Sequence, residues 1–68
     1  MIFELKGEEY IELIKLLKLL GLAESGGDAK QYVDDGDVMV NNETEYRRRK
    51  KLRTGDIVDF LNQKIEIK

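Results

Sequence analysis

The spacing of apolar residues changes at Gly36, and this change limits the folds open to the chain. Before Gly36, apolar side chains recur every three or four residues, as in a helix with one buried face. After Gly36 they alternate with polar residues, as in strands with one buried face. The sequence therefore predicts an α+β fold in which N-terminal helices pack against a small antiparallel sheet.

The clearest helix is predicted from Glu8 to about Leu20. Glu8 and Glu9 would lie in its first turn, where carboxylates interact favourably with the helix dipole. Gly21 follows and suits the left-handed conformation in which many helices end. Leu19 lies away from the main apolar face, so we expect a second element to cover it. The main face consists of Tyr10, Leu13, Ile14, Leu16, Leu17 and Leu20.

A second, shorter helix is predicted between Ser25 and Gly36. Ser25 is suited to cap its N-terminus, and Asp28, three residues later, completes a pair that resembles a capping box. The apolar stripe of this helix consists of Ala29, Tyr32 and Val33. Its C-terminal end is crowded by carboxylates that do not have the spacing of a calcium loop. We expect these residues to form a solvated acidic edge: Asp34, Asp35 and Asp37.

Short strands make up the rest of the chain, which we expect to form one domain over residues 1–68. The element order is β-α-α-β-β-β-β, and the first strand should lie beside the last. The strands are expected at Phe3–Leu5, Val38–Val40, Glu43–Arg47, Ile57–Leu61 and Ile65–Ile67. The turns between them are expected at Asn41–Asn42, Thr54–Asp56 and Asn62–Gln63.

Residues 47–53, here called the basic run, read Arg-Arg-Arg-Lys-Lys-Leu-Arg and hold 6 of the 12 basic side chains. The whole chain nevertheless has a net charge of −2. Six adjacent positive charges repel one another, and a polyanion relieves that repulsion. In an extended strand, Arg47, Arg49 and Lys51 would lie on one face and Arg48 and Lys50 on the other. Both faces would be polar, which favours an edge strand or a projecting arm. The alternative is a solvated, charged turn.

The amino-acid inventory excludes several kinds of chemistry. The chain of 68 residues has no Cys and no His. It can therefore form no disulfide, no zinc site with these ligands and no His-based acid–base pair. It offers little volume for a substrate pocket, so we expect no enzyme, no cofactor and no small-molecule substrate. No apolar stretch is long enough for a membrane span and no secretory signal is present, so a cytoplasmic location is expected.

Taken in order, several short motifs resemble the RNA-binding domain named after ribosomal small-subunit protein four, here called the S-four domain. The motifs are Leu20-Gly21-Leu22-Ala23-Glu24-Ser25, then Ala29 and Val33, then Gly36-Asp37-Val38-Met39-Val40-Asn41, the basic run, and Gly55-Asp56-Ile57-Val58. The resemblance covers about residues 8 to 60. It is greatest to stand-alone bacterial members, in which the domain is the whole protein.

The resemblance implies the αL RNA-binding fold and a partner that is structured RNA, ribosomal or transfer, or the ribosome itself. The implied contact face joins the start of the second helix, the hairpin turn and the basic run. Its residues are Ser25, Gly26, Gly27, Lys30, Gln31, Asn41, Asn42, Tyr46, Arg47, Arg48, Arg49, Lys50, Lys51 and Arg53. Two positions depart from the family. Residues 8–12 lack the Arg-Leu-Asp with which many members begin the first helix, and Asn42 replaces the usual Gly of the hairpin.

Three alternatives stay open from the residues alone. Ser25-Gly26-Gly27 presents backbone N–H groups that suit a phosphate, with Lys30 one turn further on, or it is an ordinary capped helix start. Tyr46 is placed either to stack on a base or to pack against the sheet. The basic run is suited either to RNA or to a protein partner or anionic lipid surface.

Overall fold

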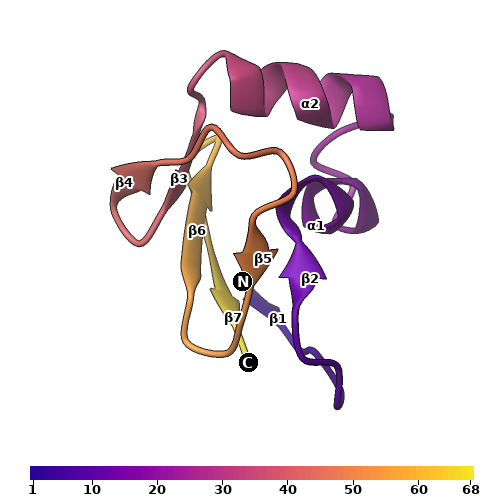
Figure 1. Ribbon diagram of the computed structural model, residues 1–68, viewed down its shortest axis with the longest axis vertical. Helices are drawn as coiled ribbons and strands as arrows, with labels where there is room; N and C mark the ends of the chain where they lie inside the picture. Colours follow the sequence, from indigo (N-terminus) through magenta and orange to yellow (C-terminus); the bar gives the residue numbers. More distant parts are fainter.

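All 68 residues are described by the computed structural model, which contains two helices and seven short strands (Figure 1). The predicted α+β class is confirmed, and two strands that the sequence did not predict interrupt the expected order. The helices are α1 (Leu13–Leu19) and α2 (Gly26–Asp34). The strands are β1 (Ile2–Phe3), β2 (Ile11–Glu12), β3 (Val38–Val40), β4 (Glu43–Thr44), β5 (Lys51–Leu52), β6 (Ile57–Phe60) and β7 (Gln63–Ile67).

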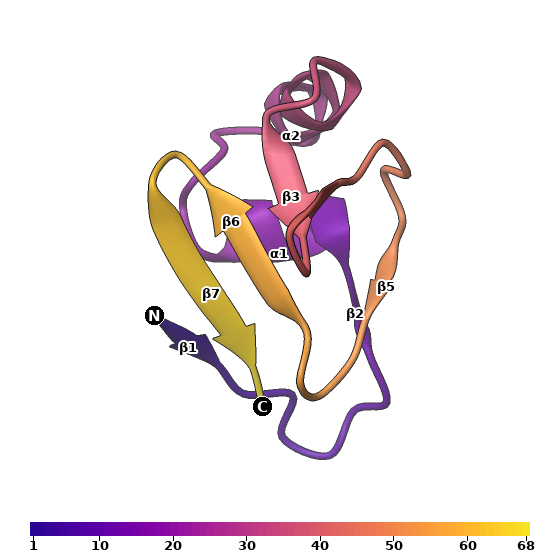
Figure 2. The same ribbon diagram turned by 90° about the vertical axis from the view of Figure 1, so that its left-hand side faces the viewer.

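Five strands form the main sheet, in the order β1-β7-β6-β3-β4. The first strand lies beside the last, as expected. This pair is parallel, with Ile2 opposite Glu66, while the other pairs are antiparallel. The sheet is therefore mixed and not wholly antiparallel. Strands β2 and β5 form a separate two-stranded ribbon beside it (Figure 2).

Helix α1 begins at Leu13, five residues later than its spacing predicted. Residues 8–10 lie in a loop, so Glu8 and Glu9 do not occupy the first turn. Ile11 pairs instead with Leu52, and this pairing buries both side chains. Burial of two large apolar residues outweighs a weak local preference for helix. The prediction failed because Tyr10 has the spacing of the apolar face of a helix that includes Leu13 and Leu17.

Leu19 is 61% exposed, so the prediction that a second element covers it is wrong. The buried face of α1 is made by Leu13, Leu16 and Leu17, each fully inaccessible to solvent. Because α1 has only two turns, its covered stripe is narrow, and Leu19 projects on the uncovered side. An exposed leucine therefore remains on the outer surface of α1.

Helix α2 has the expected bounds and cap. The Ser25 hydroxyl accepts a hydrogen bond from the Asp28 amide at 3.1 Å, and Gly36 follows the helix with φ of 79°. Asp28 makes no return bond to Ser25, so only half of the capping box forms. Asn41 and Asn42 both have positive φ, as the predicted hairpin turn requires. The last turn is at Leu61 and Asn62, one residue earlier than predicted.

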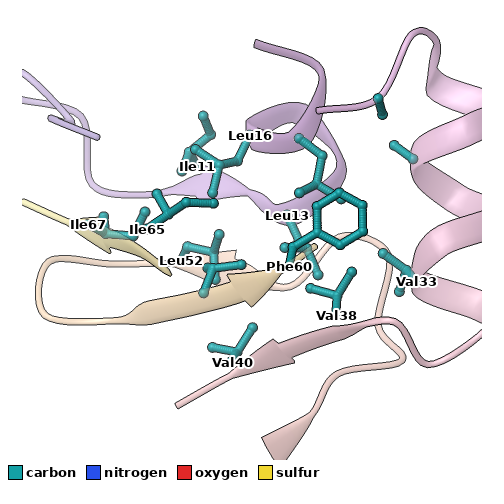
Figure 3. Close-up of a cluster of buried hydrophobic side chains, with 14 of the residues drawn as sticks. Ile11, Leu13, Leu16, Val33, Val38, Val40, Leu52, Phe60, Ile65 and Ile67 are labelled. Carbon is teal, nitrogen blue, oxygen red and sulfur yellow. The ribbon is translucent and has the colours of Figure 1, made fainter. Parts of the chain in front are cut away.

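The core lies between the helices and the two sheets, and 15 buried apolar residues form it (Figure 3). Phe60 is its largest fully buried side chain and meets the edge of the Tyr32 ring, with the centroids 4.8 Å apart. Leu52, from the basic run, is fully buried in this cluster. The basic run is thus tied to the core through one leucine.

Candidate nucleic-acid interface

The basic run is mostly a loop, and only Lys51 and Leu52 belong to a strand. Its backbone caps α1. The Leu13 amide donates to the Lys50 carbonyl at 3.0 Å, and the Ile14 amide donates to the Arg48 carbonyl at 3.2 Å. These bonds satisfy amides that a helix start leaves without partners. The carbonyls of the run are held by the fold, while most of its side chains are left exposed.

Five basic side chains line one shallow depression, here called the basic patch: Arg47, Arg49, Lys50, Lys51 and Arg53. No apolar or acidic residue lines it. The simple alternation expected of an extended strand is wrong, because a turn at Arg48 and Arg49 brings Arg49 and Lys50 to the same depression. Arg48 is the one basic residue of the run that does not line the patch. Such a surface attracts a polyanion more strongly than scattered charges do.

Arg48 turns toward α2 and pairs with Asp34 near the end of that helix. Its Nε donates to Asp34 Oδ1 at 2.9 Å, and its second guanidinium nitrogen donates to Oδ2 at 2.5 Å. The guanidinium lowers the pKa of the Asp34 carboxyl by hydrogen bonding, and the pKa of Arg48 is raised in turn. Both views show the loop of the basic run beside α2 (Figures 1 and 2). Asp34, which was expected to belong to a solvated acidic edge, instead tethers the run to α2.

Arg47 is held by Glu45, whose side chain is only 11% exposed. Two side-chain bonds of 2.9 and 3.1 Å join the guanidinium to the carboxylate, and the Arg47 amide donates to the same carboxylate at 3.0 Å. Hydrogen bonding from Arg47 lowers the pKa of Glu45. The Arg47 side chain stays 71% exposed, so its outer edge remains available to a ligand. Glu45 thus fixes where one cation of the patch lies.

We expect Glu45 to make folding stability dependent on pH. A carboxylate whose pKa is lowered in the folded state adds stability above its unfolded value, near 4.5 for Glu45. That contribution disappears as the pH falls through the lowered folded value. Urea unfolding between pH 7 and pH 3 should therefore show a steeper loss of stability for the wild type than for Glu45→Gln. Glu43 is exposed and has no ion pair, so Glu43→Gln should lose stability with falling pH as steeply as the wild type does.

Tyr10 is a part of the site that the sequence did not reveal. Lys51 Nζ lies 5.0 Å from the centre of its ring, and the Arg53 guanidinium carbon lies 5.6 Å away. Cations at this distance are attracted by the negative face of the ring. Tyr10 therefore positions two cations of the patch without neutralising them. Its spacing indicated a helical core residue, and only the β2–β5 pairing explains its place.

The hairpin residues have different environments. The Asn41 amide donates to Asp56 Oδ1 at 3.0 Å, and its oxygen accepts from the Ile57 amide at 2.9 Å, so this side chain is occupied within the fold. Asn42 is exposed at the turn. Tyr46 is 65% exposed, and its hydroxyl would lie 3.1 Å from a Cβ built at Gly36. Tyr46 therefore rests on Gly36 at the surface and not in the core.

The start of α2 is the end of that helix farther from the β3–β4 hairpin turn (Figure 1). The Ser25 hydroxyl is used as a cap, while Lys30 is exposed. The Gln31 amide donates to Asp35 at 2.8 Å. A Cβ at Gly26 or Gly27 would meet only ordinary contacts of 4.0 and 3.7 Å. Packing therefore does not require glycine at either position.

Residues 3–68 match the S4 domain, which is the S-four domain that the sequence motifs resemble. The chain belongs to this family of proteins. The "Putative RNA-binding protein YbcJ" of Escherichia coli K12 is 37% identical over 65 residues, which cover 96% of this chain and 93% of YbcJ. The "Probable ribosome maturation protein RlbA" of Bacillus subtilis 168 is 43% identical over 52 residues, 76% of this chain and 73% of RlbA.

The solution structure of YbcJ is similar to this fold, with a TM-score of 0.73 and 36% sequence identity. The match covers 97% of this chain and 84% of that one. The YbcJ structure is described as having an alfaL motif involved in RNA binding. The fold expected from the sequence motifs is thereby confirmed. Neither helix of the chain is long and apolar enough to cross a membrane.

Proposed function

We propose that this chain is a non-catalytic RNA-binding protein and that the basic patch is its main contact with RNA. The observation that carries the proposal is a depression lined only by five basic side chains. Of these five side chains, Arg47 alone is in a salt bridge, and the other four have no carboxylate partner. Unpaired cations gathered on one surface are suited to the phosphates of a folded nucleic acid.

The chemistry of the patch favours the recognition of backbone and shape. Arginine can donate two parallel hydrogen bonds to one phosphate, while lysine acts as a compact charge. The patch has no Asn or Gln, the side chains that read adenine, so within the patch a base edge is read only at guanine, by Arg or Lys. Tyr46, exposed beside the run, provides a surface on which an unpaired base can stack. We therefore propose structured RNA as the ligand, with few base-specific contacts.

We further propose ribosomal or transfer RNA as the physiological ligand. The name of RlbA refers to ribosome maturation, and this supports the proposal of a ribosomal partner for the present chain. Crosslinking the protein in cell extract and sequencing the attached RNA tests this part directly. Reads that concentrate in ribosomal or transfer RNA would support it, while reads spread in proportion to messenger abundance would contradict it.

Two neighbouring arginines allow a test of whether RNA binding depends on the basic patch or only on the total charge of the basic run. Arg49 lines the patch, while Arg48 is turned away and paired with Asp34. We expect Arg49→Ala to weaken the binding of ribosomal RNA fragments about tenfold, since a charged hydrogen bond contributes about 1.5–3 kcal/mol. Arg48→Ala removes the same charge and should change affinity about threefold or less, within the ~0.5 kcal/mol typical of surface changes. Equal losses would contradict the assignment of the patch.

We propose a secondary phosphate contact at the start of α2. The amides of Gly26 and Gly27 have no partner within the fold, and nothing in the packing calls for glycine there. Ser25→Ala should lower stability by about 0.5–2 kcal/mol through loss of the cap. Gly27→Ala should weaken RNA binding without unfolding the protein, and adding Lys30→Ala should give less than an additive loss. RNA titrations of these variants that match the wild type would leave Ser25 as a cap alone.

A further inference from the structure

A second concave surface lies beside the basic patch and has the opposite chemistry. It is a groove of about 570 Å³ between the N-terminal segment and α1. Its apolar lining comes from Phe3, Leu5, Tyr10, Ile11 and Leu19. Its polar lining comes from Glu8, Glu9, Glu12 and Lys15. We call this surface the acidic groove.

Three of the five apolar residues that line the acidic groove are accessible to solvent, while Leu5 and Ile11 are buried. Leu19 is 61% exposed and Tyr10 is 36% exposed, while Phe3 is half-buried. Large apolar side chains that line an open groove are typical of a docking surface.

The carboxylates of the acidic groove have no ion-pair partners. None of Glu8, Glu9 and Glu12 takes part in a salt bridge of this chain. With Lys15 included, the formal charge of the lining is −3 + 1 = −2. This charge opposes the approach of RNA phosphates, so the groove cannot extend the RNA contact. It attracts a positively charged ligand that also offers apolar side chains.

We propose that the acidic groove docks a segment of another protein in which Lys or Arg residues flank a large apolar side chain. The apolar side chain would cover Leu19 and Phe3, and the basic residues would meet the unpaired carboxylates. Tyr10 borders both surfaces, since its ring also lies under Lys51 and Arg53. A bound segment would therefore lie next to the basic patch. The inference goes beyond RNA binding and does not depend on it.

A second copy of this chain is a poorer occupant of the groove. The basic run of another copy supplies the positive charge, but Leu52, its only apolar residue, is fully buried. Leu52 therefore cannot cover Leu19. Tyr46, the exposed ring beside that run, has basic residues on one side only, because Glu43 and Glu45 precede it. The groove calls for both features in one segment, which favours a different protein.

Selection from a randomised nonapeptide library tests the proposal without assuming a partner. The wild-type protein should enrich peptides with Lys or Arg on both sides of Leu, Ile, Phe or Met. An enriched peptide, made with a fluorescent label, should bind Leu19→Ser and Glu8→Gln/Glu9→Gln about tenfold more weakly than the wild type. Leu61→Ser and Glu43→Gln are matched controls, because Leu61 is 55% exposed and neither residue lines the groove. Both controls should retain wild-type peptide affinity.

Three results would overturn the proposal. One is the absence of enrichment for this pattern, and another is an equal loss of peptide binding in the groove variants and their controls. The third is a dimer in sedimentation that dissociates on Leu19→Ser, which would assign the groove to a second copy. RNA affinity is measured in parallel and should be unchanged by Leu19→Ser. A failure of peptide docking is therefore distinguishable from a failure of RNA binding.

Discussion

The Arg49→Ala/Lys51→Ala variant is expected to bind structured RNA about 100-fold more weakly than the wild type. Both side chains line the basic patch, and neither has a carboxylate partner. Loss of two charged phosphate contacts, each at the lower end of the usual range of about 1.5–3 kcal/mol, gives a change of this size. Filter binding or fluorescence titration with a ribosomal RNA fragment measures it.

Salt dependence shows whether the lost contacts were made to phosphates. If four or five cations neutralise phosphates, the slope of log affinity against log salt should lie near −3 to −4.5 for the wild type, at roughly 0.7–0.9 ion per contact. The double variant should have a slope smaller in magnitude by about 1.5–2. An unchanged slope would mean that Arg49 and Lys51 do not meet phosphates, even if affinity falls.

The control for this experiment removes two positive charges that lie outside the basic patch. Lys64→Ala/Lys68→Ala removes two positive charges from β7 and its end, outside the patch. We expect it to change RNA affinity about threefold or less, as distant surface charges are largely screened beyond about 8–10 Å. If this control lost as much affinity as the patch variant, overall charge and not the patch would determine binding.

The parts of the fold that the sequence predicted are those that depend on local chemistry. Ser25 caps α2, Gly36 follows that helix with positive φ, and Asn41–Asn42 form the hairpin turn. Each of these needs only the properties of a few neighbouring residues. The alternation of Ile65 and Ile67 likewise predicted the last strand, because both side chains face the same core.

The parts that the sequence missed depend on contacts between distant residues. Ile11 lies inside the predicted helix but belongs to a strand, because Leu52, far along the chain, pairs with it. The same pairing moves Tyr10 from an expected core position to a place under Lys51 and Arg53. Periodicity within one segment carries no information about such a partner.

The basic run illustrates both outcomes. Its charge identified the region from which the candidate site is built. Which of its residues are paired within the fold and which line the patch is visible only in the structure. Arg48 ties the run to Asp34, and Glu45 holds Arg47. The carboxylates that accept these two bonds lie in α2 and in the segment before the run. The basic side chains that we propose for RNA contact are therefore the five of the basic patch and not the six that the charge count indicated.

The last expectation concerns Leu52, the residue through which the basic run is joined to the core. Its side chain is fully buried, so Leu52→Ala should leave a cavity and cost about 2–5 kcal/mol of stability. A chain of 68 residues has roughly 3–10 kcal/mol in total, so the variant should lose a large share of its stability and melt at a lower temperature. Leu19→Ala is the matched control, because that leucine is 61% exposed and should change stability by no more than about 0.5 kcal/mol.

RNA binding by Leu52→Ala separates the structural role of Leu52 from a role in contact. No atom of a fully buried side chain can touch RNA, so the weaker binding should reflect only the unfolded fraction. An osmolyte that restores folding should therefore restore affinity to the wild-type level. Circular dichroism and RNA titration in the same buffers measure the two quantities together. A folded Leu52→Ala protein that still bound RNA weakly would instead mean that this leucine sets the shape of the basic patch, beyond its contribution to stability.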